Sequence, residues 1–204
     1  MNPIARLARG FVRLEVDVWV SLGRAITRKP DTAGGVPIRY AGAVSAFLWA
    51  FVVVSAVEIP AMHLLIPWAP VRIVALVLGA WGLLWILGTL AGHHMYSHLL
   101  TDEQLRVRYL RRTRLDIPLT AIRSVHPELR AYDGTKSLQL TGPTSDTLAV
   151  TVGSSTNIRL TLTTPHTFHT PHGDFTATAI ALWADDPQAA VTSIRAAMTT
   201  HRAA

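Results

Sequence analysis

Two long apolar stretches separated by a proline-containing corner dominate the pattern of hydrophobic and polar positions along the chain. The first covers about residues 41–62 and the second about residues 71–91, and neither has a polar stripe at helical spacing. Each is about 20 residues long, the length that an α-helix needs to cross roughly 30 Å of hydrocarbon. The pattern predicts a transmembrane helical hairpin within residues 40–92. The alternative is one very apolar buried hairpin.

The segment before the hairpin, residues 1–39, predicts an amphipathic helix followed by a linker. Between residues 4 and 26, apolar side chains recur at steps of three and four, and arginines fall on the opposite side. Such a helix lies in a membrane interface with its arginines on anionic headgroups, here Arg6, Arg9 and Arg13. A helix packed on the soluble domain or on a second subunit is the alternative. Pro and Gly in residues 28–37 indicate a linker.

After the hairpin, the period changes to two, which predicts a β domain in residues 93–204. Turn residues separate short alternating runs, and Asp185-Asp186-Pro187 starts a C-terminal helix expected over residues 185–201. The strands are expected at residues 95–100, 105–109, 113–117, 122–125, 137–140, 148–152, 158–162 and 177–183. The fold class is therefore membrane α + β: an amphipathic helix, a transmembrane hairpin, and an antiparallel barrel or sandwich capped by a helix.

Charge adds an orientation to this arrangement. Residues 1–39 hold 7 Lys/Arg against 3 acids, residues 93–204 hold 11 against 9, and residues 40–92 hold only Arg72 and Glu58. By the positive-inside rule, both termini are cytoplasmic and the corner Pro60–Pro70 is outside the inner membrane. The chain has no cysteine, which excludes disulfides and thiolate ligands.

Ionisable residues near the outer corner have two interpretations. A structural ion pair between Glu58 and Arg72 would close the outer end of the hairpin, because a charge in lipid seeks a partner. A proton or substrate relay through Glu58 and His63 is the sharper alternative, but two groups at one end do not make a path across a bilayer.

Two stretches carry a resemblance to a known family. They are Tyr96-Ser-His-Leu-Leu-Thr-Asp-Glu-Gln-Leu-Arg-Val107 and Arg114-Leu-Asp-Ile-Pro-Leu-Thr-Ala-Ile-Arg-Ser-Val125. Together with the order of elements, they resemble the bacterial pleckstrin-homology-like (PH-like) domains, and the whole chain is similar to a group of actinobacterial two-span membrane proteins of unknown function. The resemblance implies a seven-stranded barrel capped by a helix and carries over no catalytic residue. The turn departs from the pattern, with Leu110-Arg111 where a Gly is usual.

The most informative cluster is a set of five arginines on two neighbouring predicted strands. They are Arg106, Arg108, Arg111, Arg112 and Arg114. With the apolar residues inward, we expect Arg106 opposite Arg114 and Arg108 opposite Arg112. Like charges across a strand pair are unfavourable, so the cluster favours an anion. The strand at 95–100 leads away from the bilayer and the next returns, which brings Arg111 near acidic headgroups. A solvated or partner-facing strand is the alternative.

Histidines offer candidate metal ligands at two places. His94 and His98 are four residues apart, and residues 165–174 contain His166, His169, His172 and Asp174. In the second stretch, the strand ends and turn do not align these side chains, and the sequence predicts no metal site and no cofactor. The nucleophile elbow, the zinc-protease helix motif, the phosphate-binding loop and the dinucleotide fingerprint are absent from the sequence.

Together these features predict a non-catalytic integral membrane protein. Its cytoplasmic domain would bind acidic lipid headgroups or a protein partner, as an accessory subunit or a homo-oligomer. The alternative is a transporter component or membrane enzyme that uses Glu58 and His63, or the juxtamembrane His93, His94 and His98. Nucleic-acid binding is not expected, because the arginine strands lack interleaved aromatic residues beyond Tyr109.

Overall fold

The computed structural model describes residues 3–32, 34–134, 136–142, 144–171 and 173–203, without the side chains of residues 3–9, 11, 202 and 203. The chain divides into two compact units. The helical unit consists of Met1–Pro30 and Val44–Met95, and the β unit consists of Asp31–Ala43 and Tyr96–Ala204. These units differ from the predicted boundaries after residues 39 and 92, because each unit combines segments that are far apart in sequence.

Three helices form the helical unit: α1 (Pro3–Ile26), α2 (Gly42–Leu65) and α3 (Ala69–Met95). Among the described residues, α2 and α3 are the two helices that are long and apolar enough to cross a membrane. They confirm the prediction of two long apolar helices, and both extend further than expected. Helix α2 continues through Pro60, and Pro70 lies in the first turn of α3, where a missing N–H costs nothing.

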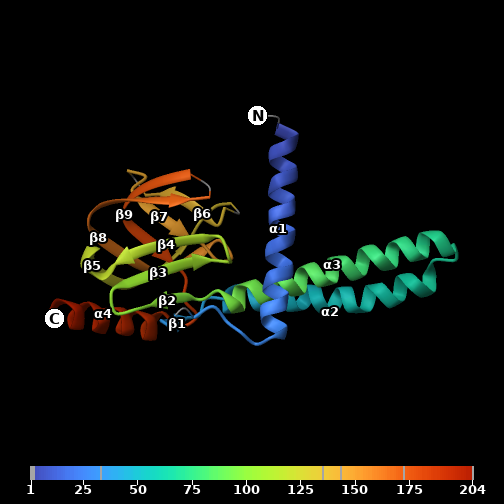
Figure 1. Ribbon diagram of the computed structural model, residues 1–204, viewed down its shortest axis with the longest axis horizontal. Coiled ribbons are helices and arrows are strands. Elements are labelled where there is room, and N and C mark those ends of the chain that lie inside the picture. The colour runs from blue at the N-terminus through green and yellow to red at the C-terminus, as the bar shows by residue number, and fades with distance from the viewer. Residues whose placement is uncertain (1–2, 33, 135, 143, 172, 204) are drawn as a thin grey trace. The chain divides into compact units, whose positions relative to one another are not determined.

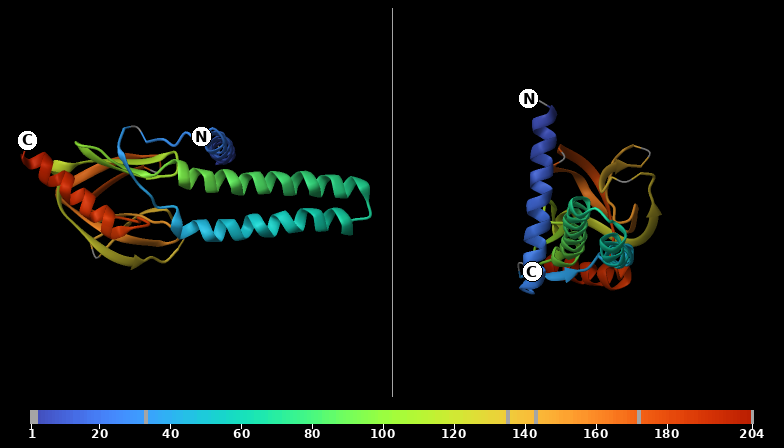
Figure 2. Two further views of the ribbon diagram at one scale, coloured as in Figure 1. Left: turned by 90° about the horizontal axis from the view of Figure 1, so that it is seen from below. Right: turned by 90° about the vertical axis from the view of Figure 1, so that its right-hand side faces the viewer.

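Glycines set the two close approaches in the helical unit. A Cβ atom added to Gly79 of α3 would lie 2.9 Å from Cγ1 of Ile59 in α2. A Cβ atom added to Gly88 would lie 2.8 Å from the carbonyl oxygen of Val18 in α1. Small residues thus let helices approach closely within this chain. Figures 1 and 2 show that α1 crosses the α2–α3 pair steeply rather than running along it.

Two sheets form the β unit (Figure 1). The first contains, in spatial order, β1 (Val36–Ile38), β2 (His98–Leu100), β3 (Gln104–Tyr109) and β4 (Thr113–Pro118). The second contains β5 (Ile122–Ala131), β8 (Ser155–Thr170), β9 (Gly173–Leu182), β7 (Thr147–Val150) and β6 (Leu138–Thr141). A 3₁₀ turn, Leu119–Ala121, joins the sheets, and α4 (Pro187–Ala203) ends the chain.

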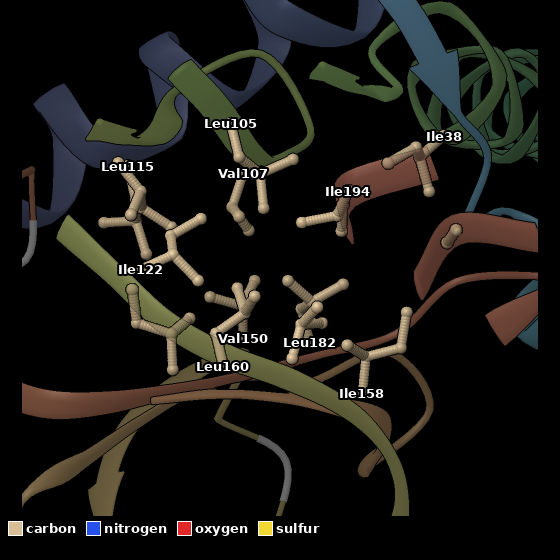
Figure 3. Packing of buried hydrophobic residues seen from close by; sticks show 14 of the residues in the cluster. Ile38, Leu105, Val107, Leu115, Ile122, Val150, Ile158, Leu160, Leu182 and Ile194 are labelled. Carbon is tan, nitrogen blue, oxygen red and sulfur yellow. The ribbon is translucent and has the colours of Figure 1, made fainter. Parts of the chain in front are cut away.

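The described residues of the two sheets share a hydrophobic core that lies between them. Inward-facing residues of the first sheet, such as Leu105 and Val107, meet those of the second, such as Val150 and Leu160, and Ile194 of α4 joins the same cluster (Figure 3). The sheets do not close into one barrel, and β7 runs parallel to β9. The structure is therefore an α + β sandwich with a C-terminal helix on its core. The expected all-antiparallel arrangement is wrong at β7.

The first strand lies in a segment that the composition marks as a linker. Val36 pairs with Leu100 and Ile38 pairs with His98, so β1 completes the edge of a sheet whose other strands follow the helical hairpin. Pro37 suits an edge strand, where one ladder hydrogen bond is not needed. The strand predicted at residues 95–100 is shorter in the structure, because α3 continues to Met95 and β2 begins at His98.

Candidate functional site

Strands β3 and β4 form the arginine hairpin, residues 104–118, with a register that differs from the prediction. Arg106 lies opposite Asp116, and Arg108 lies opposite Arg114. The expected pairing of Arg108 with Arg112 would draw Tyr109 into the turn. The observed pairing keeps Tyr109 in the strand, with its ring centroid 6.4 Å from that of Tyr40, and leaves residues 110–112 as the turn.

The new register gives two of the arginines a shared carboxylate. The Nε atom of Arg106 lies 2.7 Å from Oδ1 of Asp116, and the Nε atom of Arg114 lies 2.6 Å from Oδ2 of the same carboxylate. The side chain of Arg106 is 13% exposed, and that of Arg114 is 51% exposed. Asp116 therefore neutralises part of the strand face: Arg106 lies opposite a carboxylate, whereas Arg108 still lies opposite an arginine, Arg114.

Arg108 is the most deeply placed member of the cluster. Its Nη1 atom lies 3.4 Å from Oδ2 of Asp31 and donates a hydrogen bond of 3.0 Å to the Asp31 carbonyl oxygen. Burial lowers the pKa of the Arg108 guanidinium, and the carboxylate of Asp31 opposes that shift. Arg108 therefore fastens the segment before β1 to the hairpin and does not face solvent.

The remaining two arginines lie in the turn itself. Arg111 and Arg112 are both exposed, and Leu110 before them has a φ of 53°. This left-handed conformation is one that Gly usually supplies. The sequence-predicted cluster thus separates into two largely buried members that hold the fold, Arg106 and Arg108, and an exposed group of Arg111, Arg112 and Arg114.

A buried aromatic network holds the base of the turn. The Tyr40 side chain is fully buried, its hydroxyl accepts a hydrogen bond of 2.8 Å from the Leu110 N–H, and its ring stacks on His98 at 4.7 Å. Nδ1 of His98 accepts the Arg108 N–H at 2.9 Å, and its Nε2 donates to the Trp183 carbonyl oxygen at 3.0 Å. Both ring nitrogens are therefore occupied.

These hydrogen bonds fix His98 as the neutral tautomer protonated at Nε2. Burial lowers the pKa of His98 to about 4, and the nearby Arg108 guanidinium acts in the same direction. Burial also raises the pKa of Tyr40 well above its ordinary value. His98 therefore serves as a packed structural group, and neither nitrogen offers a lone pair to a metal or to substrate chemistry.

The other predicted histidines are dispersed over the described chain. His94 Nε2 lies 3.2 Å from the Ser45 hydroxyl, and His93 is buried in α3. On the β8–β9 hairpin, His169 Nδ1 pairs with Asp174 Oδ1 at 2.8 Å, and the His166 ring packs against Phe168. His172 falls outside the described residues. Among the described residues, no three His, Asp or Glu side chains gather as metal ligands would.

The expected ion pair between Glu58 and Arg72 is not formed in the described part of the chain. Ile59 packs on Gly79, which puts Glu58 level with Ala80. Eight residues, about 12 Å of helix, separate that level from Arg72. The prediction of this pair was wrong because α2 and α3 are longer than expected, which moves the corner beyond Pro60.

Helix α1 carries the predicted interfacial arginines. Arg13 is exposed, and the side chains of Arg6 and Arg9 lie outside the described residues. Val18 and Ser21 are buried where α1 crosses α3. Helix α1 therefore packs on α3 through one short face, and the rest of α1 extends away from the crossing point.

Sequence reasoning missed a clamp at the start of α2. The Asp185 carboxylate accepts the Gly42 N–H at 2.8 Å, and the Asp185 N–H donates to the Arg39 carbonyl oxygen at 2.8 Å. Asp186, its neighbour, caps α4 by accepting the Ala189 N–H at 2.9 Å. The doubled Asp was the available signal: one carboxylate caps the local helix, and the other serves a helix 143 residues away.

We compared the chain with known proteins, and no family model, no curated protein and no solved structure matches it.

Proposed function

We propose that the chain is a non-catalytic integral membrane protein of the inner membrane, with both termini cytoplasmic. Its β unit binds acidic lipid headgroups through the turn surface, defined as Arg111, Arg112 and Arg114. A protein partner with an acidic surface is the alternative occupant. The proposal rests on the two apolar helices, the distribution of charge and the construction of the arginine turn.

Strand pairing supports this topology independently of charge. Val36 and Ile38 precede α2, and their partners Leu100 and His98 follow α3. Because strands that pair must be in the same compartment, both flanks of the hairpin lie on one side of any membrane that α2 and α3 cross. The excess of Lys and Arg on these flanks favours the cytoplasmic side.

One hydrogen bond carries the lipid proposal. The Leu110 N–H donates to the Tyr40 hydroxyl, and Tyr40 lies two residues before Gly42, the first residue of α2. Because β2 and β3 are antiparallel, the turn also lies at the end of the sheet where the chain enters β2 at His98. The turn surface therefore occupies the edge of the β unit from which both connections to the apolar helices leave.

The charge of this edge suits an anionic leaflet. Residues 104–118 contain five arginines and one acidic residue, Asp116, so the hairpin carries an excess of positive charge even with Asp31 beside Arg108. Each arginine near an acidic leaflet contributes about 1 kcal/mol of attraction. Removing Arg111 and Arg112 should then weaken docking by about 2 kcal/mol, or roughly thirtyfold.

The test uses the full-length protein in nanodiscs of phosphatidylcholine with and without phosphatidylglycerol. Backbone hydrogen exchange is followed over residues 104–118. We expect the anionic lipid to slow exchange in the turn, and high salt to reverse the effect because it screens exposed charges. In the double variant Arg111→Gln/Arg112→Gln, exchange should be equally fast in both lipids.

The matched control removes two exposed charges away from the turn, one on β5 and one in the loop between β5 and β6. Arg123→Gln/Lys136→Gln lowers the net charge by the same amount and leaves the turn intact. This control should keep the lipid response. A turn whose exchange ignores phosphatidylglycerol in the wild-type protein contradicts the lipid proposal, and protection that appears only with a co-purified acidic protein favours the alternative occupant.

A further inference from the structure

A shallow, open cleft between α1 and α3 places a carboxylate beside tryptophans. Its lining consists of Glu15 from α1 and of Leu78, Trp81, Gly82 and Trp85 from α3, and its volume is about 280 Å³. Nothing lies within 4 Å of the position that a Cβ atom on Gly82 would take, so this glycine keeps the floor of the cleft open.

The carboxylate is oriented but not neutralised. Trp19 Nε1–H donates a hydrogen bond of 3.0 Å to Oε2 of Glu15. Among the described residues, no basic side chain pairs with Glu15, and Oε1 has no hydrogen-bond donor. A carboxylate beside apolar walls is costly unless a cation accompanies it. The site is therefore complementary to a small positive group.

Tryptophan faces add a second attraction for the same kind of group. Trp81 and Trp85 line the cleft, and Trp19 lies beside its carboxylate; Trp19 is 45% exposed and Trp81 is 43% exposed. The face of an indole ring attracts ammonium groups, most strongly where water is excluded. A carboxylate with several indole rings provides the elements of a site for an organic ammonium ion.

The position of the cleft along α3 indicates where that ammonium would come from. Trp68 suits the outer membrane boundary, and the twenty residues from Trp68 to Gly88 cover about 30 Å, the thickness of the hydrocarbon layer. Helix α1 crosses at Gly88, and Trp85 is three residues, about 4.5 Å, from that level. On the same count Trp81 and Leu78 lie about 10 Å and 15 Å from that level, so the cleft extends from near the inner boundary towards the middle of the hydrocarbon. At its Trp85 end, lipid headgroups are the abundant cations.

We propose that this cleft binds the primary ammonium group of phosphatidylethanolamine. The ammonium donates hydrogen bonds to Oε1 of Glu15 and rests against Trp81 and Trp85, and the acyl chains lie along α3. The proposal rests on the membrane location proposed above. The cleft lies in the helical unit and would bind a cation, whereas the turn surface lies in the β unit and would bind anions.

The experiment measures which lipids the full-length protein retains. Protein reconstituted in equal amounts of phosphatidylethanolamine, phosphatidylcholine and phosphatidylglycerol is released into mild detergent, and bound lipids are counted by native mass spectrometry. We expect phosphatidylethanolamine to exceed phosphatidylcholine by about tenfold, the ratio that one charge-assisted hydrogen bond contributes. The choline headgroup has a positive charge but no N–H donors, so the retention of phosphatidylcholine measures the contribution of the charge alone.

Two variants and one control localise the effect. Glu15→Gln keeps an acceptor for Trp19 and removes the charge, and Gly82→Leu fills the open floor; both should bring the ratio close to one. Glu58→Gln removes a carboxylate from α2 and should leave the ratio unchanged. Equal enrichment in wild type and Glu15→Gln overturns the proposal, and so does equal retention of both lipids by the wild type.

Other outcomes are separable in the same spectra. A dimer that depends on Glu15 and carries no lipid would mean that a cation of a second copy occupies the cleft, which also overturns the proposal. The Arg111→Gln/Arg112→Gln variant should keep the phosphatidylethanolamine ratio, so a failure of the turn surface leaves this result intact. Alkaline extraction from native membranes tests the membrane location by itself.

Discussion

Protonation of His98 should destabilise the β unit in mild acid. In the folded chain its Nδ1 accepts the Arg108 N–H and its Nε2 donates to the Trp183 carbonyl oxygen, so a second ring proton has no acceptor. Burial lowers its pKa from 6.5 to about 4. Between these values the unfolded chain binds a proton that the folded chain rejects. The stabilisation is therefore present above pH 6.5 and is lost as the pH falls towards 4.

The magnitude follows from the two pKa values of His98. The complete shift corresponds to about 3 kcal/mol, and about 2 kcal/mol of it is lost between pH 7.5 and pH 5.0. The assay is pulse proteolysis in urea on the full-length protein in detergent, at pH 7.5, 6.5 and 5.0. The free energy of unfolding of the β unit should fall steeply across this range.

His98→Gln provides the reference, because other titrating groups contribute equally to both proteins. This variant should be less stable at pH 7.5, since it loses the stacking on Tyr40. Between pH 7.5 and 5.0, however, its free energy of unfolding should fall by about 2 kcal/mol less than that of the wild type. Equal losses in the two proteins between pH 7.5 and 5.0 would refute the assignment of His98 as a buried neutral group.

Three further substitutions test the contacts that join distant segments. Gly42→Ala would place a Cβ atom 2.8 Å from Oδ1 of Asp185, and the loss of this cap should cost about 1 kcal/mol in a thermal melt. Asp31→Ala leaves the Arg108 guanidinium without its carboxylate; we expect a loss of about 1–3 kcal/mol and faster hydrogen exchange in β1 and β2. Gly88→Leu should separate α1 from α3, so trypsin should cut α1 faster than in the wild type.

The parts of the fold that the sequence predicts well are those with a local period. The two apolar helices follow from composition and length, and the strands at 105–109 and 113–117 follow from strict alternation. The start of α4 follows from a capping Asp before Pro187. In each case the side chains that decide the structure lie within a few residues of one another.

The parts that sequence reasoning missed depend on contacts between distant residues. Strand β1 has only three residues, too few to show an alternating pattern. It forms because the edge of β2, some 60 residues later in the chain, is free to pair with it. Similarly, the parallel pairing of Leu148 with Ile180 is invisible to alternation, which is the same for both strand directions.

The pairing of the arginine hairpin differs from the register that the sequence predicted. The sequence identifies the five arginines, but their partners are set by a register that Tyr40 selects from 70 residues away. A two-residue change in pairing exchanges an arginine for Asp116 opposite Arg106 and so changes the electrostatics of the face. The carboxylate of Asp31 was counted as part of a linker, which hid the partner of Arg108.

The first sheet contains strands from both sides of α2 and α3, so the β unit cannot finish folding before these helices have been synthesised. Strand β1 and Tyr40 are made before these helices, and β2 and β3 are made after them. The pairing of β1 with β2, the stacking of Tyr40 on His98 and the Arg108–Asp31 contact therefore cannot form until the chain after α3 has been synthesised. A fragment that starts at residue 96 would lack all three contacts and leave the edge of β2 unpaired, which favours aggregation. The β unit thus combines segments from both sides of α2 and α3, and it is complete only after both helices have been synthesised.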